Sequence, residues 1–305
     1  MSELIAAYEA YRDELLEAGI LVNTGVAGLY GRNGTFENVI SGVNHLMDES
    51  SLGDKPERFA FPPLIARRTY ELTDHLKSFP DLMGAIHSFS GGDVEHRALT
   101  ASYTNGEDWP SQLSTTDMML CPAACYPIYP MLSNKPLPEG GRIFDVIGFC
   151  FRHEPSPDPA RMQLFRQHEN VYVGTPDGAL AFRNRWIDRS LDVLGGLGLE
   201  VTAEVANDPF FGRAGRMLKA NQVEANLKYE IVAPICSTEK QTAIASCNCH
   251  LDHLSVPFQV TTHDGEVAHS ACVGFGLERI ALALFKKHGL DVHSWPTAVR
   301  SALWP

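Results

Sequence analysis

Short runs in which apolar and polar residues alternate fill the second half of the chain, and they predict β-strands. These runs lie near residues 143–152, 163–173, 229–236, 242–249, 256–262 and 267–274. Apolar residues at helical spacing predict helices over residues 3–18, 65–76, 177–196, 213–226 and 276–288. Consecutive strands with turn signals between them, interrupted by helices, predict an α+β fold whose sheet is mostly antiparallel and flanked by helices.

No internal repeat or linker divides the 305 residues. We therefore expect a single domain over residues 1–305, with residues 1–60 as an N-terminal lead-in. Glycines at a spacing of three predict a turn-rich loop, because this spacing differs from the dinucleotide-binding G-x-G-x-x-G pattern. These glycines are Gly25, Gly28, Gly31 and Gly34.

Composition and charge disfavour several classes of protein function. The formal net charge is −12 and the pI is about 5.4, which disfavours a wide electrostatic grip on nucleic acid. The start of the chain has no apolar signal-peptide core. The most apolar stretch, residues 118–132, contains three prolines and is too short to span a bilayer. Seven cysteines, an odd number without an export signal, are typical of a reducing cytoplasm.

One predicted hairpin, residues 144–173, gathers charged residues on a single face. Alternation predicts one shared face for several charged, thiol and aromatic side chains, namely Cys150, Arg152, Glu154, Arg161, Phe165 and Glu169. Arginine forks suit phosphate oxygens and a flat ring suits a base. An Arg–Glu ladder across an exposed hairpin is the alternative interpretation.

A second segment, VGFGLERIALALF at residues 273–285, predicts a strand-to-helix junction. Gly274 and Gly276 allow the backbone to approach a ligand closely. Arg279 lies in the first turn of the predicted helix, where a cation is unfavourable beside the helix dipole. An anionic partner for Arg279 is therefore expected.

Together these segments resemble class II aminoacyl-tRNA synthetases. FRHE followed by Arg161 and Phe165 is similar to motif 2, GFGLER is similar to motif 3, and residues 61–64 with the helix after them resemble motif 1 weakly. The resemblance implies a class II aminoacyl-tRNA synthetase-like catalytic domain with Arg152 and Arg279 as catalytic residues. It assigns the ATP α-phosphate and the amino-acid carboxylate to Arg152, and the γ-phosphate and one face of the base to Arg279. It also assigns nucleotide contacts to Glu154, Arg161 and Met162, and the other face of the adenine to Phe165.

Two sets of residues are candidates for a metal. The local set has zinc-binding residue types but short spacing, and strand alternation turns its cysteines away from its first histidine. It comprises Cys247, Cys249, His250 and His253. The second set, Cys125, Glu169 and Cys272, comes only from a resemblance to the atypical zinc-dependent seryl-tRNA synthetases. That resemblance implies a zinc ion with one open position, which the substrate α-amino group fills next to Glu169. Cys121 is interpreted as a buried thiol.

The resemblance that covers essentially the whole chain is to the amino acid:[carrier protein] ligases. It implies ATP-dependent activation of a small amino acid, glycine or alanine, as aminoacyl-adenylate. The aminoacyl group then passes to the phosphopantetheine thiol of an acyl carrier protein. Zn²⁺ and Mg²⁺ with ATP are the implied cofactors. Ala243 stands where seryl enzymes have a metal-holding glutamate, which leaves the Mg²⁺ positions open, and Ser246 is a candidate substrate-pocket residue.

The same resemblance implies a homodimer. The expected lead-in carries no basic run, so no tRNA-binding domain and no tRNA partner are expected, and no membrane association is expected either. A basic segment with Arg213 and Arg216 is the candidate dock for an acidic carrier. Two alternatives remain open, which are a compact seryl-tRNA synthetase and a non-catalytic protein that senses an amino acid.

Overall fold

A large twisted sheet organises the protein. The computed structural model describes residues 2–73, 75–206 and 226–305. Within these residues, seven strands form the main sheet in the order β3 (Glu57–Ala60), β7 (Arg142–Phe151), β8 (Leu164–Gly174), β12 (His269–Gly276), β11 (Thr242–Leu251), β10 (Lys228–Ala233) and β9 (Thr202–Val205). Strand β3 runs parallel to β7 and every other neighbouring pair is antiparallel. The predicted mostly antiparallel α+β architecture is confirmed.

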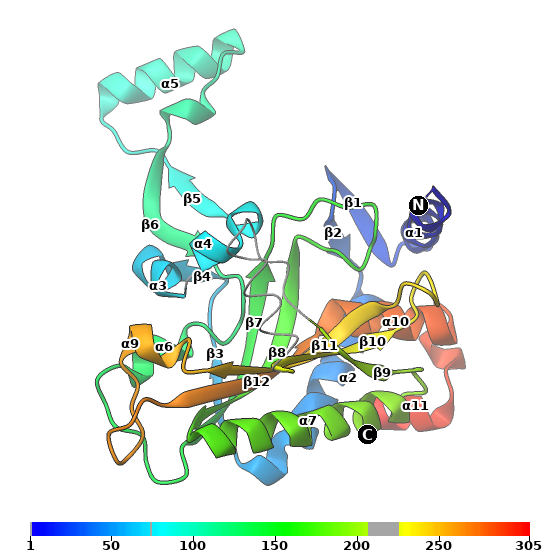
Figure 1. Ribbon diagram of the computed structural model, residues 1–305. Coiled ribbons are helices and arrows are strands. Elements are labelled where there is room, and N and C mark those ends of the chain that lie inside the picture. The colour runs from blue at the N-terminus through cyan, green and yellow to red at the C-terminus, as the bar shows by residue number, and fades with distance from the viewer. Residues whose placement is uncertain (1, 74, 207–225) are drawn as a thin grey trace.

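Helices cover one face of this sheet (Figure 1). They are α1 (Ser2–Glu17), α2 (Gly34–Ser51), α7 (Pro176–Gly196), α10 (Leu277–His288) and α11 (Thr297–Leu303). Strand alternation sends every second side chain of β12 into this core, where the ring of Trp186 lies 6.0 Å from that of Phe275. The ring centroids of Phe36 on α2 and Phe285 on α10 lie 5.7 Å apart, so the two helices also pack on each other.

Among the described residues, two short helices cover one end of the opposite face. Short helices α6 (Ile128–Leu132) and α9 (Ser255–Phe258) pack there over the alternate side chains of β7, β8 and β12. The strand predicted near residues 256–262 is wrong, because its first part is α9. Pro257 lies within the first turn of α9, where a residue without an N–H group costs no helical hydrogen bond.

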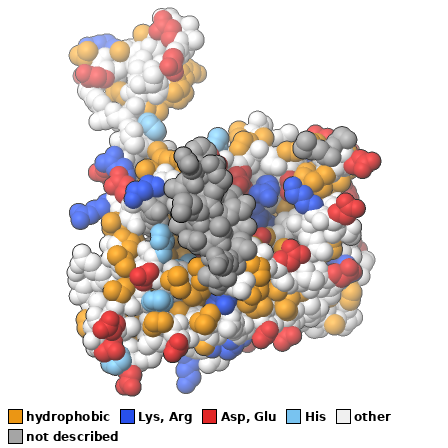
Figure 2. Space-filling view, in the orientation of Figure 1, with side chains coloured by type: hydrophobic (Ala, Val, Ile, Leu, Met, Phe, Trp, Pro, Cys, Tyr) orange, Lys and Arg blue, Asp and Glu red, His pale blue; other side chains and the backbone are white. Residues whose placement is uncertain are grey.

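The helix predicted over residues 65–76 is also partly wrong. Its first residues belong to β4 (Leu64–Ala66), and α3 (Arg67–Leu72) ends where Thr73 Oγ1 donates to Tyr70 O at 2.7 Å, ahead of α4 (His75–Ser78). Strand β4 pairs with β6 (Ser114–Leu120), which also pairs with β5 (Ala85–Ser88). Strands β5 and β6 form an arm tipped by α5 (Asp93–Asn105), which stands away from the body of the molecule (Figures 1 and 2). The short 3₁₀ helices are η1 (Leu52–Asp54), η2 (Pro80–Leu82), η3 (Pro110–Gln112) and η4 (Val292–Ser294).

The expected lead-in, residues 1–60, contributes β3 and α2 to the main layers. It also contains a hairpin of β1 (Leu21–Val26) and β2 (Leu29–Arg32), where a turn-rich loop was predicted. Gly25 and Gly28 in its turn have φ of +86° and +72°, a region that favours glycine. The predicted helix over residues 213–226, with Arg213 and Arg216, lies outside the described residues except for its last position.

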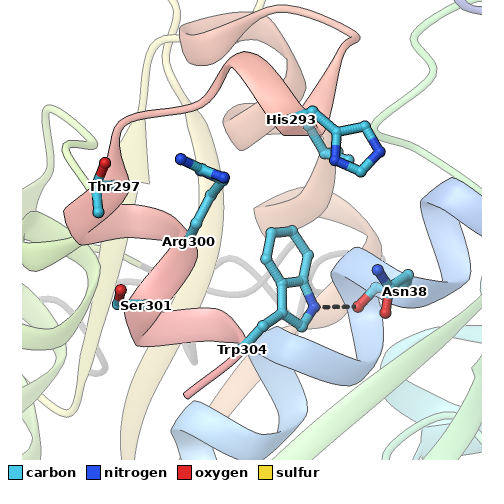
Figure 3. A pocket seen from close by; sticks show the side chains of 7 residues that line it. Asn38, His293, Thr297, Arg300, Ser301 and Trp304 are labelled. Atoms are coloured by element: carbon cyan, nitrogen blue, oxygen red, sulfur yellow. Dashed lines mark hydrogen bonds between the residues drawn. The ribbon is translucent and has the colours of Figure 1, made fainter.

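A cavity of about 410 Å³ lies on the helix-covered side, between α2 and the C-terminal segment (Figure 3). Arg300 and Trp304 line it, and Trp304 Nε1 donates to Asn38 O at 3.3 Å across it. None of the residues that the sequence predicts to be functional lines this cavity. Among the described residues, no helix combines the length and apolarity needed to cross a bilayer.

Candidate active site

Arg152 follows β7 and stands beside an aromatic ring. Its Cζ lies 5.5 Å from the ring centroid of Phe165, and its backbone N–H donates to Gln163 O at 2.9 Å. Its Nε is buried and has no hydrogen-bond partner among the described residues. A buried guanidinium nitrogen without a partner is costly, so this atom fits a bound anion.

Arg279 is held by the backbone. Its Nε donates to Ala160 O and its Nη1 to Ala243 O, both at 2.9 Å. Burial lowers the pKa of Arg279 to about 10, and repulsion from Arg161 and Arg152 adds to this shift. Three guanidinium groups therefore gather where β7, the loop before β8 and α10 meet. Negative charge bound among them would offset their mutual repulsion.

The remaining predicted nucleotide residues divide into two groups. Arg161 Nη1 donates to Glu154 Oε2 at 3.2 Å, so these two side chains pair. Arg161 lies in the loop before β8 rather than on the strand, which corrects its predicted position on the returning strand. Met162 is buried in the core, and its Sδ lies 3.9 Å from Arg32 Nη1, so its side chain packs behind the loop.

A second cluster of polar groups is fully buried on the same face of the sheet. It joins Cys125 from the loop before α6, Glu169 from β8 and Cys272 from β12, which are at most 5% exposed. The thiol of Cys125 interacts with both of the other side chains. Ala124 N–H donates to Glu169 Oε1 at 3.0 Å and fixes the carboxyl group. The structure thus brings together three residues from distant parts of the sequence.

The electrostatics of this cluster favour one thiolate. The hydrogen bond from Cys125 holds the pKa of Cys272 well below its ordinary value, while the same contact and burial hold that of Cys125 well above. Burial and the charge of Cys272 raise the pKa of Glu169 to about 7. Two thiol sulfurs, one of them favoured as a thiolate, and a carboxyl group form a donor set that suits zinc.

Two neighbours of Cys272 on β11 were not assigned to this cluster from the sequence. Asn248 Nδ2 lies 3.5 Å from Cys272 Sγ and donates to Ser246 Oγ at 3.2 Å. His250 Nε2 also lies 3.5 Å from Cys272 Sγ. Alternation along residues 242–251 puts the side chains of Ser246, Asn248 and His250 on one face of the sheet. The same alternation is visible in the sequence.

The local metal set does not assemble. Cys247 and Cys249 point into the core under the helices, whereas His250 lies on the opposite face beside Cys272. This arrangement confirms the alternation that disfavoured the set. Cys121 is 2% exposed, and its Sγ donates to Ala123 O at 3.1 Å, as expected for a buried thiol.

Another cluster with metal-ligand residue types lies beneath α2. One ligand atom each from Asp48, Asp145 and His168 lies within 4.8 Å of the others. Arg58 forms ion pairs with both carboxylates, and His168 Nε2 lies 2.8 Å from Asp145 Oδ1. A cationic side chain thus already pairs with both carboxylates of this group.

Known proteins with similar sequences identify the family. The chain is 40% identical over 292 residues to amino acid--[acyl-carrier-protein] ligase 2 of Bradyrhizobium diazoefficiens, which covers 95% of this chain and 87% of that protein. It is also 40% identical over 280 residues to amino acid--[acyl-carrier-protein] ligase 1 of the same organism. The chain belongs to the amino acid--[acyl-carrier-protein] ligase family. No protein-family model matches it.

More distant similarity leads to seryl-tRNA synthetases. The type-2 serine--tRNA ligase of Methanothermobacter thermautotrophicus is 28% identical over 185 residues, which are 58% of this chain and 36% of that protein. The structure of M. kandleri SerRS, solved in complex with A. aeolicus tRNASec, superposes with a TM-score of 0.82 at 21% identity. This chain spans 60% of that one. The seryl-tRNA synthetase of Pyrococcus horikoshii, solved with ATP, gives 0.68 at 13% identity. These structures establish the class II synthetase fold.

Proposed function

We propose that this protein activates a small amino acid with ATP and transfers it to the phosphopantetheine thiol of an acyl carrier protein. The observation that carries the proposal is the gathering of Arg152, Arg161 and Arg279 next to the buried cluster of Cys125, Glu169 and Cys272. One part suits a polyphosphate and the other suits an amino group. The names of the two Bradyrhizobium relatives support this assignment.

In the first step, a carboxylate oxygen of the amino acid attacks the α-phosphorus of ATP. The new P–O bond gives the aminoacyl-adenylate, and the bond to the β-phosphate breaks to release pyrophosphate. Arg152 and Arg279 neutralise charge on the phosphates while Phe165 stacks on the adenine. Glu154 and Arg161, which pair with each other, complete the nucleotide contacts. Mg²⁺ accompanies ATP, and the side chain of Ala243 cannot serve as its ligand.

The residues of the buried cluster fit a zinc ion. Cys125, Glu169 and Cys272 would hold it, because the thiol of Cys125 interacts with both the Cys272 thiol and the Glu169 carboxyl group and all three side chains are buried. Bound zinc supplies a Lewis acid that binds the substrate α-amino group in its deprotonated form. Asn248 and His250 support the Cys272 sulfur, and Ser246 is held within reach of the same pocket by Asn248.

In the second step, the carrier thiol attacks the acyl carbon of the adenylate. A C–S bond forms, the C–O bond to AMP breaks, and the thiol proton passes to solvent. Arg213 and Arg216 are the proposed dock for acidic groups of the carrier. Glycine is the first proposed substrate, followed by alanine. We further propose a cytoplasmic homodimer that does not use tRNA.

Amino-acid-dependent exchange of pyrophosphate into ATP tests this proposal. Glycine or alanine should support exchange, and a phosphopantetheinylated carrier should then accept the aminoacyl group while tRNA does not. If no amino acid supports exchange, the protein senses an amino acid rather than activating it. If tRNA is charged and the carrier is not, the compact seryl-tRNA synthetase alternative is correct.

A further inference from the structure

Gln167 occupies the middle of the open face of the sheet. It lies on β8 between Phe165 and Glu169, and side chains two positions apart on a strand are about 6.6 Å apart. Its neighbours across the sheet are Gly148 on β7 and Gly276 on β12. Neither neighbour has a side chain, so Ala124 can pack over Gly148 and Arg279 can pack over Gly276, one on each side of Gln167.

The orientation of this amide follows from its partners. Cys150 Sγ donates to Gln167 Oε1 at 2.9 Å, and Ala124 N–H approaches the same oxygen at 3.4 Å. Both groups are donors, so they require the oxygen and not the NH₂ group on their side. Burial holds the pKa of Cys150 well above its ordinary value, which keeps this thiol protonated and able to donate.

The NH₂ group consequently points away from Cys150 and Ala124. A Cβ atom placed on Gly274 would lie 3.9 Å from Gln167 Nε2, so the amide nitrogen reaches over the glycines of β12. Within the described residues, no acceptor receives a hydrogen bond from Nε2, and Gln167 is partly exposed. A positioned donor without an acceptor among these residues, with Arg279 beside the neighbouring Gly276, suits an oxygen of a ligand.

We propose that Gln167 binds the substrate through its NH₂ group, which donates to a carboxylate oxygen of the amino acid and then to the acyl oxygen of the adenylate. The proposal rests on the proposed function. Phe165 marks the nucleotide side of Gln167 and Glu169 marks the amino-group side, and the mixed anhydride joins these two halves of the ligand. Cys150 is a positioning residue, because its thiol fixes the amide without contacting the substrate.

Two pairs of variants test this role by pyrophosphate exchange. Gln167→Met keeps the length of the side chain and removes the donor, and a hydrogen bond to a charged oxygen corresponds to about tenfold to hundredfold in binding. We expect kcat/KM for the amino acid to fall by about this factor while KM for ATP changes less than about threefold. Gln167→Glu should lose more, because its carboxylate repels the substrate carboxylate.

The second pair separates positioning from packing. Cys150→Ser keeps a donor and should retain most activity, whereas Cys150→Ala removes it and should lower kcat/KM for the amino acid by about threefold to tenfold. Thermal unfolding and bound zinc, measured for all four variants, identify any loss of fold. Wild-type kcat/KM in Gln167→Met, or a defect confined to KM for ATP, would overturn the proposal. Should Gln167→Met not fold, equal activity of the two Cys150 variants would overturn it. Absence of exchange in the wild-type protein would instead reject the proposed function itself.

Discussion

The β1–β2 hairpin supports the loop that carries some of the proposed nucleotide-binding residues. Gln163 forms the link, since its N–H donates to Gly28 O at 2.8 Å and its Nε2 to Ala27 O at 2.7 Å. The carbonyl of the same residue accepts from Arg152 N–H at 2.9 Å. The turn of the hairpin is therefore two hydrogen bonds from the backbone of Arg152. Damage to this turn should weaken ATP binding.

Gly28→Ala is the direct perturbation. Its φ of +72° is strained for alanine by about 1–2 kcal/mol. In addition, the new Cβ would lie 3.2 Å from Arg161 O and 3.3 Å from Gln163 Cγ, so the loop must shift. Loss of both Gln163 hydrogen bonds would cost about 2 kcal/mol, and partial loss about half of that. Since 1.4 kcal/mol corresponds to tenfold, KM for ATP should rise by about fivefold to thirtyfold.

Gly25→Ala is the matched control. Gly25 has φ of +86°, so alanine is strained there to a similar degree, but no atom lies within 4 Å of the added Cβ. Both variants should lose similar stability in thermal unfolding, and only Gly28→Ala should raise KM for ATP in pyrophosphate exchange. Equal values of KM for ATP in the two variants would refute the link from the hairpin to Arg152.

Three further predictions concern the metal cluster, the arginines and an ion pair. Cys125→Ala and Cys272→Ala should lose zinc in metal analysis, together with exchange activity, whereas Cys236→Ala should keep both; retained zinc in the first two would exclude the proposed ligands. Arg279→Lys should lower exchange by at least about tenfold and also lower the unfolding temperature, because one ammonium group cannot replace a fork that donates to two backbone carbonyls. The guanidinium group of Arg166 on β8 lowers the pKa of Glu37. The stabilisation of the fold by this ion pair is therefore present above the unfolded pKa of Glu37 and is lost as pH falls through its folded pKa. Glu37→Gln should therefore reduce the free energy of unfolding at pH 7, and the difference from wild type should disappear in acid.

Local patterns predicted the five central strands of the sheet, β7, β8, β10, β11 and β12, and the helices α1, α7 and α10, but they missed β3, β9 and α2. The strands near residues 143–152 and 163–173 correspond to β7 and β8, and their antiparallel pairing follows from the short proline-rich turn between them. Alternation correctly separated Cys247 from His250. These predictions succeeded because a half-buried strand has a strict period of two.

Elsewhere, long-range packing overrode the local sequence pattern, and the predicted secondary structure was wrong. Residues 256–262 carry a strand-like composition, but the chain forms α9 there to cover the end of the sheet. The pairing of β4 with β6 draws Ile65 away from the helix predicted for it. Gln167 has no distinctive sequence pattern, because its role depends on donors from Cys150 and Ala124 that only the fold brings together.

The strand β8 explains how one element serves both halves of the proposed reaction. Phe165, Gln167 and Glu169 occupy successive positions on its open face, so their order along the strand matches adenine, acyl group and amino group along an aminoacyl-adenylate. On its other face, Arg166 donates to Glu278 Oε1 at 2.8 Å, which ties the strand to the helix of Arg279. A strand fixed in this way from behind cannot shift one half of the site without the other. Changes to the buried Glu278 should thus disturb nucleotide and amino-acid binding together, whereas changes at Gln167 should separate them.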